Sequence, residues 1–259
     1  MRTARSRYDT FAYHCSTCVL RRSHSTLRVV WCAQYCVGAM DGIQINIQAP
    51  RSSEIAKTTS FFCRKQFYSL NVQAVCDSRT RFLCVSIVCP GSCHDSVAYA
   101  QSDIPQQVAA LPGLYHIVAD AAYPESEKVL CPFAGRGLPT YEDSYNYHQS
   151  QVRMSIERAF GICVARWGVL WRPLRTSLQN SVRIIRACML LHTFCLDELS
   201  EVDAAVPTGV FDARGKLSAA YKTGNDTRSR VSVAGVCVMR TYIRQQLEQR
   251  KQKRPDPQS

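Results

Sequence analysis

The sequence predicts an α/β protein in which a mixed sheet is flanked by helices. Two patterns lead to this class: short apolar or alternating segments dominate residues 35–135, and apolar residues recur with a helical period from residue 143 onward. The chain has 259 residues, of which 46% are hydrophobic and 20% are charged. This composition is typical of a folded protein with a substantial core.

Five strands are expected in the first half of the chain. Residues 35–50 predict the first strand, because "IQINIQ" alternates apolar with polar side chains. Residues 68–92 predict two strands joined by a turn at residues 77–80. The apolar run "LYHIVAD", at residues 114–120, predicts a buried strand, and "KVLCPFAG" predicts a short strand after it.

Four helices are expected around this sheet. "HDSVAYAQSDI" predicts a helix between the third and fourth strands, with Ser92 or Asp95 as its cap. Residues 180–199 predict a more buried helix, and the basic residues of 240–254 predict a short basic helix with a frayed tail. Residues 143–167 predict a long amphipathic helix, because apolar residues recur every four positions: Val152, Ile156, Phe160 and Val164.

The charge of the chain indicates a polyanionic partner. Lys and Arg number 32 against 20 Asp and Glu, a formal net charge of +12, which favours nucleic acid or an anionic membrane surface. No apolar run approaches the roughly 20 residues of a membrane helix. The N-terminal residues are basic but lack the apolar run of a signal peptide, so an intracellular protein is expected.

Fourteen cysteines are present, and most stand in apolar runs, where a reduced Cys acts as a small hydrophobe. One group has the spacing of a metal knuckle: Cys15, Cys18, Cys32 and Cys36. However, Cys36 opens an apolar segment that is typical of a core strand. Core or free thiols are therefore preferred over a zinc site.

Three acidic residues break apolar segments at positions that suit a functional site. Asp41 stands inside the first strand beside Gly42, where burial of a charge is unfavourable unless it is paired or metal-bound. Asp120 ends the fourth strand, where sites of open α/β sheets gather. Glu157 lies at the rim of the long helix. Each has a simpler alternative. Asp41 could lie in a β-bulge and face solvent, Asp120 could form a turn or helix cap, and Glu157 could be a solvated residue paired with Arg153.

Together the three carboxylates predict a site for divalent cations. Two Asp and one Glu supply the hard oxygen ligands that Mg²⁺ or Mn²⁺ prefers. Two such ions about 4 Å apart can activate a water and stabilise the leaving oxygen in phosphodiester cleavage.

The residues after Glu157 suit a phosphate polymer. Residues 158–196 contain no acid, and Trp167 and Trp171 lie among their basic residues and could stack on bases or belong to the core. The stretch contains Arg but no Lys, which favours bidentate phosphate contacts. The arginines are Arg158, Arg166, Arg172, Arg175, Arg183 and Arg186.

Seven ordered motifs resemble the DDE endonuclease domain of PIF/Harbinger transposases and the harbinger-transposase-derived nucleases. The similarity runs from about residue 36 to residue 199, and 36 residues separate Asp120 from Glu157. The motifs are "CVGAMDG", "FYSLNVQAVCD", "PGSCHDS", "ADAAYP", "YNYHQSQVRMSIERAFG", "RWGVLWRPL" and "IIRACMLLHTFCLD".

The resemblance implies a ribonuclease-H-like fold and a nuclease. It implies that Asp41, Asp120 and Glu157 are the catalytic, metal-binding triad for Mg²⁺ or Mn²⁺. His94 and Asp95 belong to a family motif and are interpreted as supporting the ligands from behind, with a helix cap or direct metal ligation as the alternatives for Asp95. Candidate contacts to the DNA backbone are Arg153, Arg158 and Arg166.

The resemblance divides the chain into a basic N-terminal segment (1–34), an endonuclease domain (35–199) and a C-terminal extension with a basic tail (200–259). The expected partners are DNA, a helper DNA-binding protein and a second copy of the chain, with no membrane, and the expected compartment is the nucleus.

Some positions depart from the family pattern. Ile43 and Gln44 replace the usual Thr-His after the first Asp-Gly, and Thr193 replaces the Asn of a Leu-His-Asn motif. The recognition region of full-length transposases has no counterpart in residues 1–34. Two hypotheses follow: a metal-dependent DNA endonuclease, or a domesticated or decayed copy that binds DNA or protein without cutting. Cleavage with Mn²⁺ separates them.

Overall fold

The computed structural model describes residues 35–198, 238–249 and 253, and its centre is a five-stranded mixed sheet. The strand order is β3-β2-β1-β4-β5; β2 is antiparallel to both neighbours, whereas β1, β4 and β5 are mutually parallel. This mixed topology is compatible with the predicted ribonuclease-H-like fold. The strands are β1 (Cys36–Asn46), β2 (Ser69–Cys76), β3 (Phe82–Pro90), β4 (His116–Val118) and β5 (Val129–Leu130).

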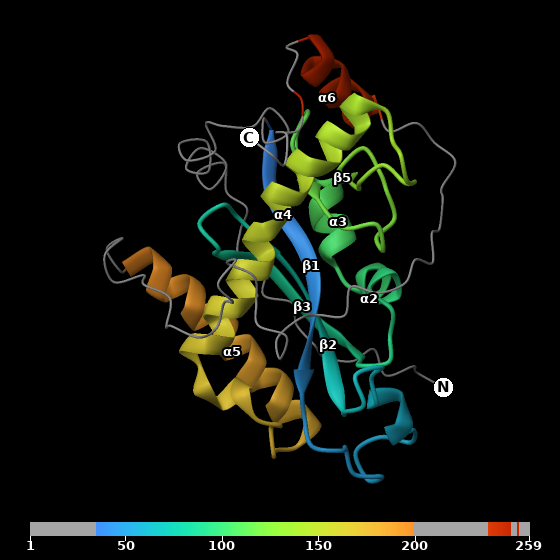
Figure 1. Ribbon diagram of the computed structural model, residues 1–259. Coiled ribbons are helices and arrows are strands. Elements are labelled where there is room, and N and C mark those ends of the chain that lie inside the picture. Colours follow the sequence, from blue (N-terminus) through green and yellow to red (C-terminus); the bar gives the residue numbers. More distant parts are fainter. Residues whose placement is uncertain (1–34, 199–237, 250–252, 254–259) are drawn as a thin grey trace.

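Helices cover both faces of the sheet (Figure 1). On one face lie α4 (Thr140–Arg166) and α5 (Leu178–Glu198), and on the other lie α2 (Asp95–Gln101) and α3 (Ile104–Ala109). Two apolar clusters result, because successive side chains of a strand point to opposite faces. Ala39 and Ile43 of β1 belong to the α4 cluster, while Met40 belongs to the α2 cluster.

The long helix α4 crosses the sheet obliquely, as Figure 1 shows. It begins at Thr140, three residues before the predicted start, because Pro139 at its N-cap precedes a favourable first turn with two acidic residues. It contacts β1 and β2 most closely. The predicted apolar stripe is confirmed, since all four of its members are buried: Val152, Ile156, Phe160 and Val164.

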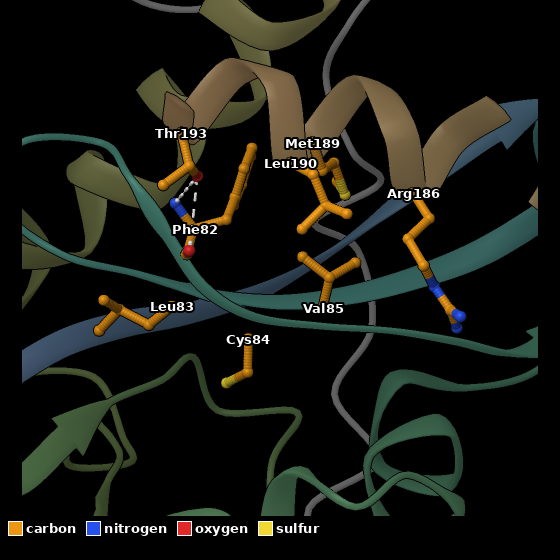
Figure 2. Close-up of a pocket in the computed structure, with 8 residues that line it drawn as sticks. All are labelled: Phe82, Leu83, Cys84, Val85, Arg186, Met189, Leu190 and Thr193. Atoms are coloured by element: carbon orange, nitrogen blue, oxygen red, sulfur yellow. Dashed lines mark hydrogen bonds between the residues drawn. The ribbon is translucent and has the colours of Figure 1, made fainter. Parts of the chain in front are cut away.

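Helix α5 is tied to the first residue of the edge strand β3 (Figure 2). The Phe82 N–H donates a hydrogen bond to Thr193 Oγ1 at 3.0 Å, and Thr193 Oγ1 also lies 3.5 Å from the Phe82 carbonyl oxygen. His192 is fully buried beside it, with Nε2 3.0 Å from the Thr80 carbonyl oxygen. Burial lowers the pKa of His192 to about 4. Thr193, which replaces the Asn of the family motif, therefore hydrogen-bonds α5 to β3 in this chain.

Helix α6 (Val238–Gln249) confirms a helix near the basic end, and its inner face belongs to the core. Arg240 forms an ion pair with Glu125 at 2.8 Å and lies 4.1 Å from the centre of the Phe133 ring. The face that packs towards α4 buries three apolar side chains: Met239, Ile243 and Leu247.

Two short 3₁₀ helices complete the described part, η2 (Thr58–Phe61) and η3 (Gly168–Trp171). None of the helices that the structure describes is long and apolar enough to span a membrane. Of the proposed metal knuckle, Cys36 is buried in β1, as the core interpretation expects. The other three members, Cys15, Cys18 and Cys32, lie outside the described residues.

Candidate active site

Asp41 and Asp120 are brought together by the register of two parallel strands. The last pair between β1 and β4 is Ala39 with Val118, and each aspartate follows two residues later. Because parallel strands advance in step and side chains alternate with a period of two, the two carboxylates continue on the same side of the sheet. The charge of Asp120 accordingly contributes to raising the pKa of Asp41.

Asp41 is a buried carboxylate with one oxygen that accepts no hydrogen bond from the described residues. Its side chain sits at the α4 face, and the residue is 4% exposed. Oδ1 accepts a hydrogen bond from the Gly42 N–H at 2.8 Å, but the buried Oδ2 has no hydrogen-bond partner in the described part of the chain. Burial raises the pKa of Asp41 to about 8, which the positive charge of Arg153 partly offsets.

Asp120 is half-buried directly after β4. Its Oδ1 accepts a hydrogen bond from the Ala122 N–H at 2.7 Å, which closes a turn and leaves Oδ2 for other contacts. Burial raises the pKa of Asp120 as well, and the charge of Arg153 acts in the opposite direction. Burial thus makes two neighbouring carboxyls costly to ionise, and added positive charge would favour their ionised forms.

Glu157 approaches the aspartates through Arg153. The Nη1 atom of Arg153 lies 3.4 Å from Glu157 Oε1 and 3.6 Å from Asp41 Oδ2. The expected pair of Arg153 with Glu157 therefore exists, but it extends to Asp41. The Glu157 side chain is 33% exposed and remains at the rim, as its place on the helix predicts.

Asp95 reaches the site from the opposite face of the sheet. Helix α2 begins at Asp95 with His94 as its N-cap residue and no capping side chain, so the cap interpretations of Asp95 and of Ser92 are wrong. Instead, Asp95 Oδ1 accepts hydrogen bonds from Asn71 Nδ2 at 3.0 Å and Gln73 Nε2 at 2.9 Å. Its charge also contributes to raising the pKa of both Asp41 and Asp120.

Gly42 makes room for this arrangement. A Cβ atom at Gly42 would lie 2.5 Å from both Asp95 Oδ1 and Gln73 Nε2, closer than any real contact. The absent side chain therefore lets Asp95 approach the backbone of β1 next to Asp41.

Sequence reasoning missed the polar residues that hold Asp95. Asn71 and Gln73 alternate with apolar residues in β2, a pattern that could have placed them on one face. Gln73 Nε2 donates to Asn71 Oδ1 at 2.7 Å, and Tyr123 Oη donates to Gln73 Oε1 at 2.6 Å. Burial, with three nearby carboxylates, raises the pKa of Tyr123 far above its usual value, so its hydroxyl stays a donor.

The remaining predicted residues lie further from the carboxylates. His94 Nδ1 is 2.7 Å from Arg64 Nη2 at the surface. Arg158 lines a pocket with Cys36 and Ser78 at the start of β1, on the other flank of α4 from Glu157. Arg166 Nη1 donates to the His192 carbonyl oxygen at 3.4 Å. Of the three candidate arginines, the structure brings Arg153 alone to the carboxylates.

The carboxylate oxygens of Asp41, Asp120 and Glu157 suit a hard divalent cation, although the Arg153 guanidinium lies between two of these residues. Within the described ranges, no three His, Cys, Asp or Glu side chains form a ready metal cluster. Asp41 Oδ2, which is buried without a hydrogen-bond partner, and the raised pKa values of Asp41 and Asp120 nevertheless mark a place where additional positive charge would be stabilising. Carboxylate oxygens are the donors that Mg²⁺ and Mn²⁺ prefer.

Comparison with known proteins identifies the family. The sequence model described as "DDE superfamily endonuclease" matches residues 40–193, more than half of the chain and all three triad candidates. The chain belongs to the DDE superfamily of endonucleases. The family predicted from the motifs is thereby confirmed, while the catalytic role of the three carboxylates stays a prediction.

Several curated proteins are similar to this chain, and two of the three named here are called nucleases. The putative nuclease HARBI1 of Bos taurus is 28% identical over 179 residues, which cover 67% of this chain and 49% of the relative. That of Rattus norvegicus is 29% identical over 177 residues, covering 67% and 49%. Protein ALP1-like of Arabidopsis thaliana is 28% identical over 180 residues, covering 62% and 43%. The chain thus spans about half the length of these superfamily members. No solved structure matched it.

Proposed function

We propose that the protein is a divalent-metal-dependent DNA endonuclease. The observation that carries this proposal is the placement of Asp41, in the middle of β1, and Asp120, just beyond the end of β4, on the same side of two parallel strands, with a buried Asp41 oxygen that has no hydrogen-bond partner among the described residues. Superfamily membership and the nuclease names of the relatives support the same reaction class.

Each residue has a defined part in this proposal. Asp41 and Asp120 would hold a first Mg²⁺ or Mn²⁺, and Glu157 would complete a second site from the rim of α4. Divalent ions bound there would supply an activated water and neutralise the charge of the leaving oxygen. Asp95, fixed by Asn71 and Gln73, would restrain the backbone of β1 beside Asp41 and add negative charge behind it.

DNA is the proposed substrate because of the charge of the chain. The formal net charge of +12 favours a polyanion, and the acid-free residues 158–196 directly follow Glu157. Four of the six arginines there are exposed, and so is Trp171, at 61%. These side chains can position a phosphate backbone but do not read its sequence. A helper DNA-binding protein and a nuclear location remain part of the proposal.

The test is a supercoiled-plasmid nicking assay with the full chain in Mn²⁺, Mg²⁺ or EDTA. We expect nicking with either metal and none in EDTA, and Asp120→Ala should abolish it while retaining DNA binding. The Arg153 guanidinium between two triad members is the observation that favours a second candidate, a DNA-binding protein that does not cleave. Salt-sensitive DNA binding without metal-dependent nicking would support that candidate and contradict the nuclease.

A further inference from the structure

Arg153 Nη1 is held by charge and not by directed hydrogen bonds. It lies 3.4 Å from Glu157 Oε1 and 3.6 Å from Asp41 Oδ2. Both Nη1 and Asp41 Oδ2 are buried, and neither has a hydrogen-bond partner among the described residues. A guanidinium engaged in charge-assisted hydrogen bonds usually approaches a carboxylate to about 2.7–2.9 Å. Arg153 therefore neutralises these carboxylates without completing that bond.

The guanidinium lies beside the carboxylate oxygens of Asp41 and Glu157. It stands between a carboxylate of β1 and a carboxylate of α4, elements that are far apart in sequence. Its charge favours the ionised forms of Asp41 and of Asp120. An arginine and a divalent ion cannot both lie closest to the same Asp41 oxygen, because two cations there would repel each other.

We propose that Arg153 is a displaceable counter-cation, whose guanidinium bridges Asp41 and Glu157 until a divalent cation enters and which must leave for that cation to bind. The inference rests on the proposed function, since it presupposes that these carboxylates take a metal. The sequence suggested that Arg153 contacts DNA. The role proposed here is a different one.

Displacement is physically favourable for two reasons. Removing one member of a buried ion pair is normally strongly destabilising because the other charge is left uncompensated, but an incoming divalent ion replaces the missing charge. In addition, the Arg153 side chain is 16% exposed and lies beside the partly exposed Glu157, so its long stem can turn towards solvent. No short hydrogen bond of Nη1 has to break.

The experiment compares Mn²⁺ binding to wild type, Arg153→Met and Arg158→Met by titration calorimetry on the full chain without DNA. The titrations are run at pH 8.5, where fewer Asp41 carboxyls hold a proton. Arg153→Met should bind Mn²⁺ at least about threefold more tightly, because a competing charge is gone. Arg158→Met should match wild type, because it removes the same charge from the same helix on the flank away from the carboxylates.

Thermal melts give a second readout. In EDTA, Arg153→Met should melt at a lower temperature than wild type, because Asp41 and Glu157 lose their counter-cation. Saturating Mn²⁺ should reduce or abolish this difference, because bound metal restores the charge and stabilises the native state by mass action. If Arg153→Met does not fold, Arg153→Gln keeps a polar group beside both carboxylates and serves in both measurements.

The outcomes separate this inference from the proposed function. Absence of Mn²⁺ binding to both wild type and the Arg153 variants would remove the metal site and the proposed function with it. Equal Mn²⁺ affinity of wild type and the Arg153 variants would overturn displacement alone. Weaker binding by the Arg153 variants would show that the guanidinium assists the metal site, and that result would also overturn the inference.

Discussion

Asp41 makes the fold sensitive to pH at the scale of a single residue. Burial raises its pKa from 3.8 to about 8, so the native state binds a proton more tightly than the unfolded chain does. Native stability from this group is fully present below pH 4 and is lost as pH rises towards 8. Asp120, whose pKa burial also raises, acts in the same direction.

Asp41→Asn should therefore flatten the pH dependence of stability. In EDTA, the free energy of unfolding of wild type should fall between pH 5 and pH 8, by at most about 1.4 kcal/mol per pH unit for each such carboxyl. The variant should lose the Asp41 part of that slope. Urea unfolding at half-unit pH steps measures this, and parallel curves for the two proteins would contradict the assigned burial of Asp41.

Gly42→Ala should destabilise the protein by about 1–3 kcal/mol, because the new methyl group would push Asp95 and Gln73 out of a buried hydrogen-bond network. Gly168→Ala is the matched control, since its Cβ would meet nothing nearer than an atom of Trp171 at 3.9 Å. Its effect should stay within about 0.5 kcal/mol. Equal denaturation midpoints for the two variants would argue against the close packing at Gly42.

Residue patterns in the sequence identified the three carboxylates as candidate site residues but did not predict the contacts between them. An acid inside an apolar strand or at a strand end is visible in a linear sequence, which is why Asp41 and Asp120 stood out. The bridge from Arg153 to Asp41 joins β1 to α4 and depends on how α4 crosses the sheet. For Asp95 the sequence left a cap and a support of the ligands both open, because the room above Gly42 exists only after folding.

At the scale of elements, periodicity succeeded wherever a segment was long enough to show it. All five strands and the helices α2, α4, α5 and α6 occur where the sequence predicts them. Helix α3 was missed because its six residues, with Pro105 in the first turn, are too few to display a helical period. The inner face of α6 was missed because its three apolar residues stand among basic ones.

Helix α6 should contribute to the stability of the whole domain. Leu247→Ala should lower the free energy of unfolding by about 2–5 kcal/mol, because this fully buried side chain belongs to the main core cluster. Tyr242→Ala removes a large side chain that is 46% exposed on the same helix and should have a much smaller effect. Chemical denaturation of both variants decides whether α6 is part of one folding unit with the sheet.

At the scale of the whole molecule, the surplus of positive charge should govern DNA affinity. Replacing Arg158 and Arg166 with Ala should weaken binding to all DNA sequences alike, and the log–log salt slope should fall by about 0.9 for each phosphate that the variant no longer neutralises. Asp120→Ala should keep its affinity. Fluorescence anisotropy at several salt concentrations measures both effects.

The basic tail must be neutralised in that comparison without deleting α6, whose apolar face is buried. Substitution of four residues by Gln achieves this: Arg250, Lys251, Lys253 and Arg254. If the double arginine variant then shows an unchanged salt slope, the DNA does not run along Arg158 and Arg166.

The register of β1 and β4 sets rules for insertions and deletions. Asp41 and Asp120 each stand two residues beyond the pair of Ala39 with Val118, so the connection between the strands can change in length without separating them. One residue inserted between Val118 and Asp120 would instead turn that carboxylate to the opposite face. One residue inserted in α4 just before Glu157 would rotate it by about 100°. Changes in length are therefore tolerable in the loop between β1 and β4. They are harmful between Val118 and Asp120 and in α4 just before Glu157.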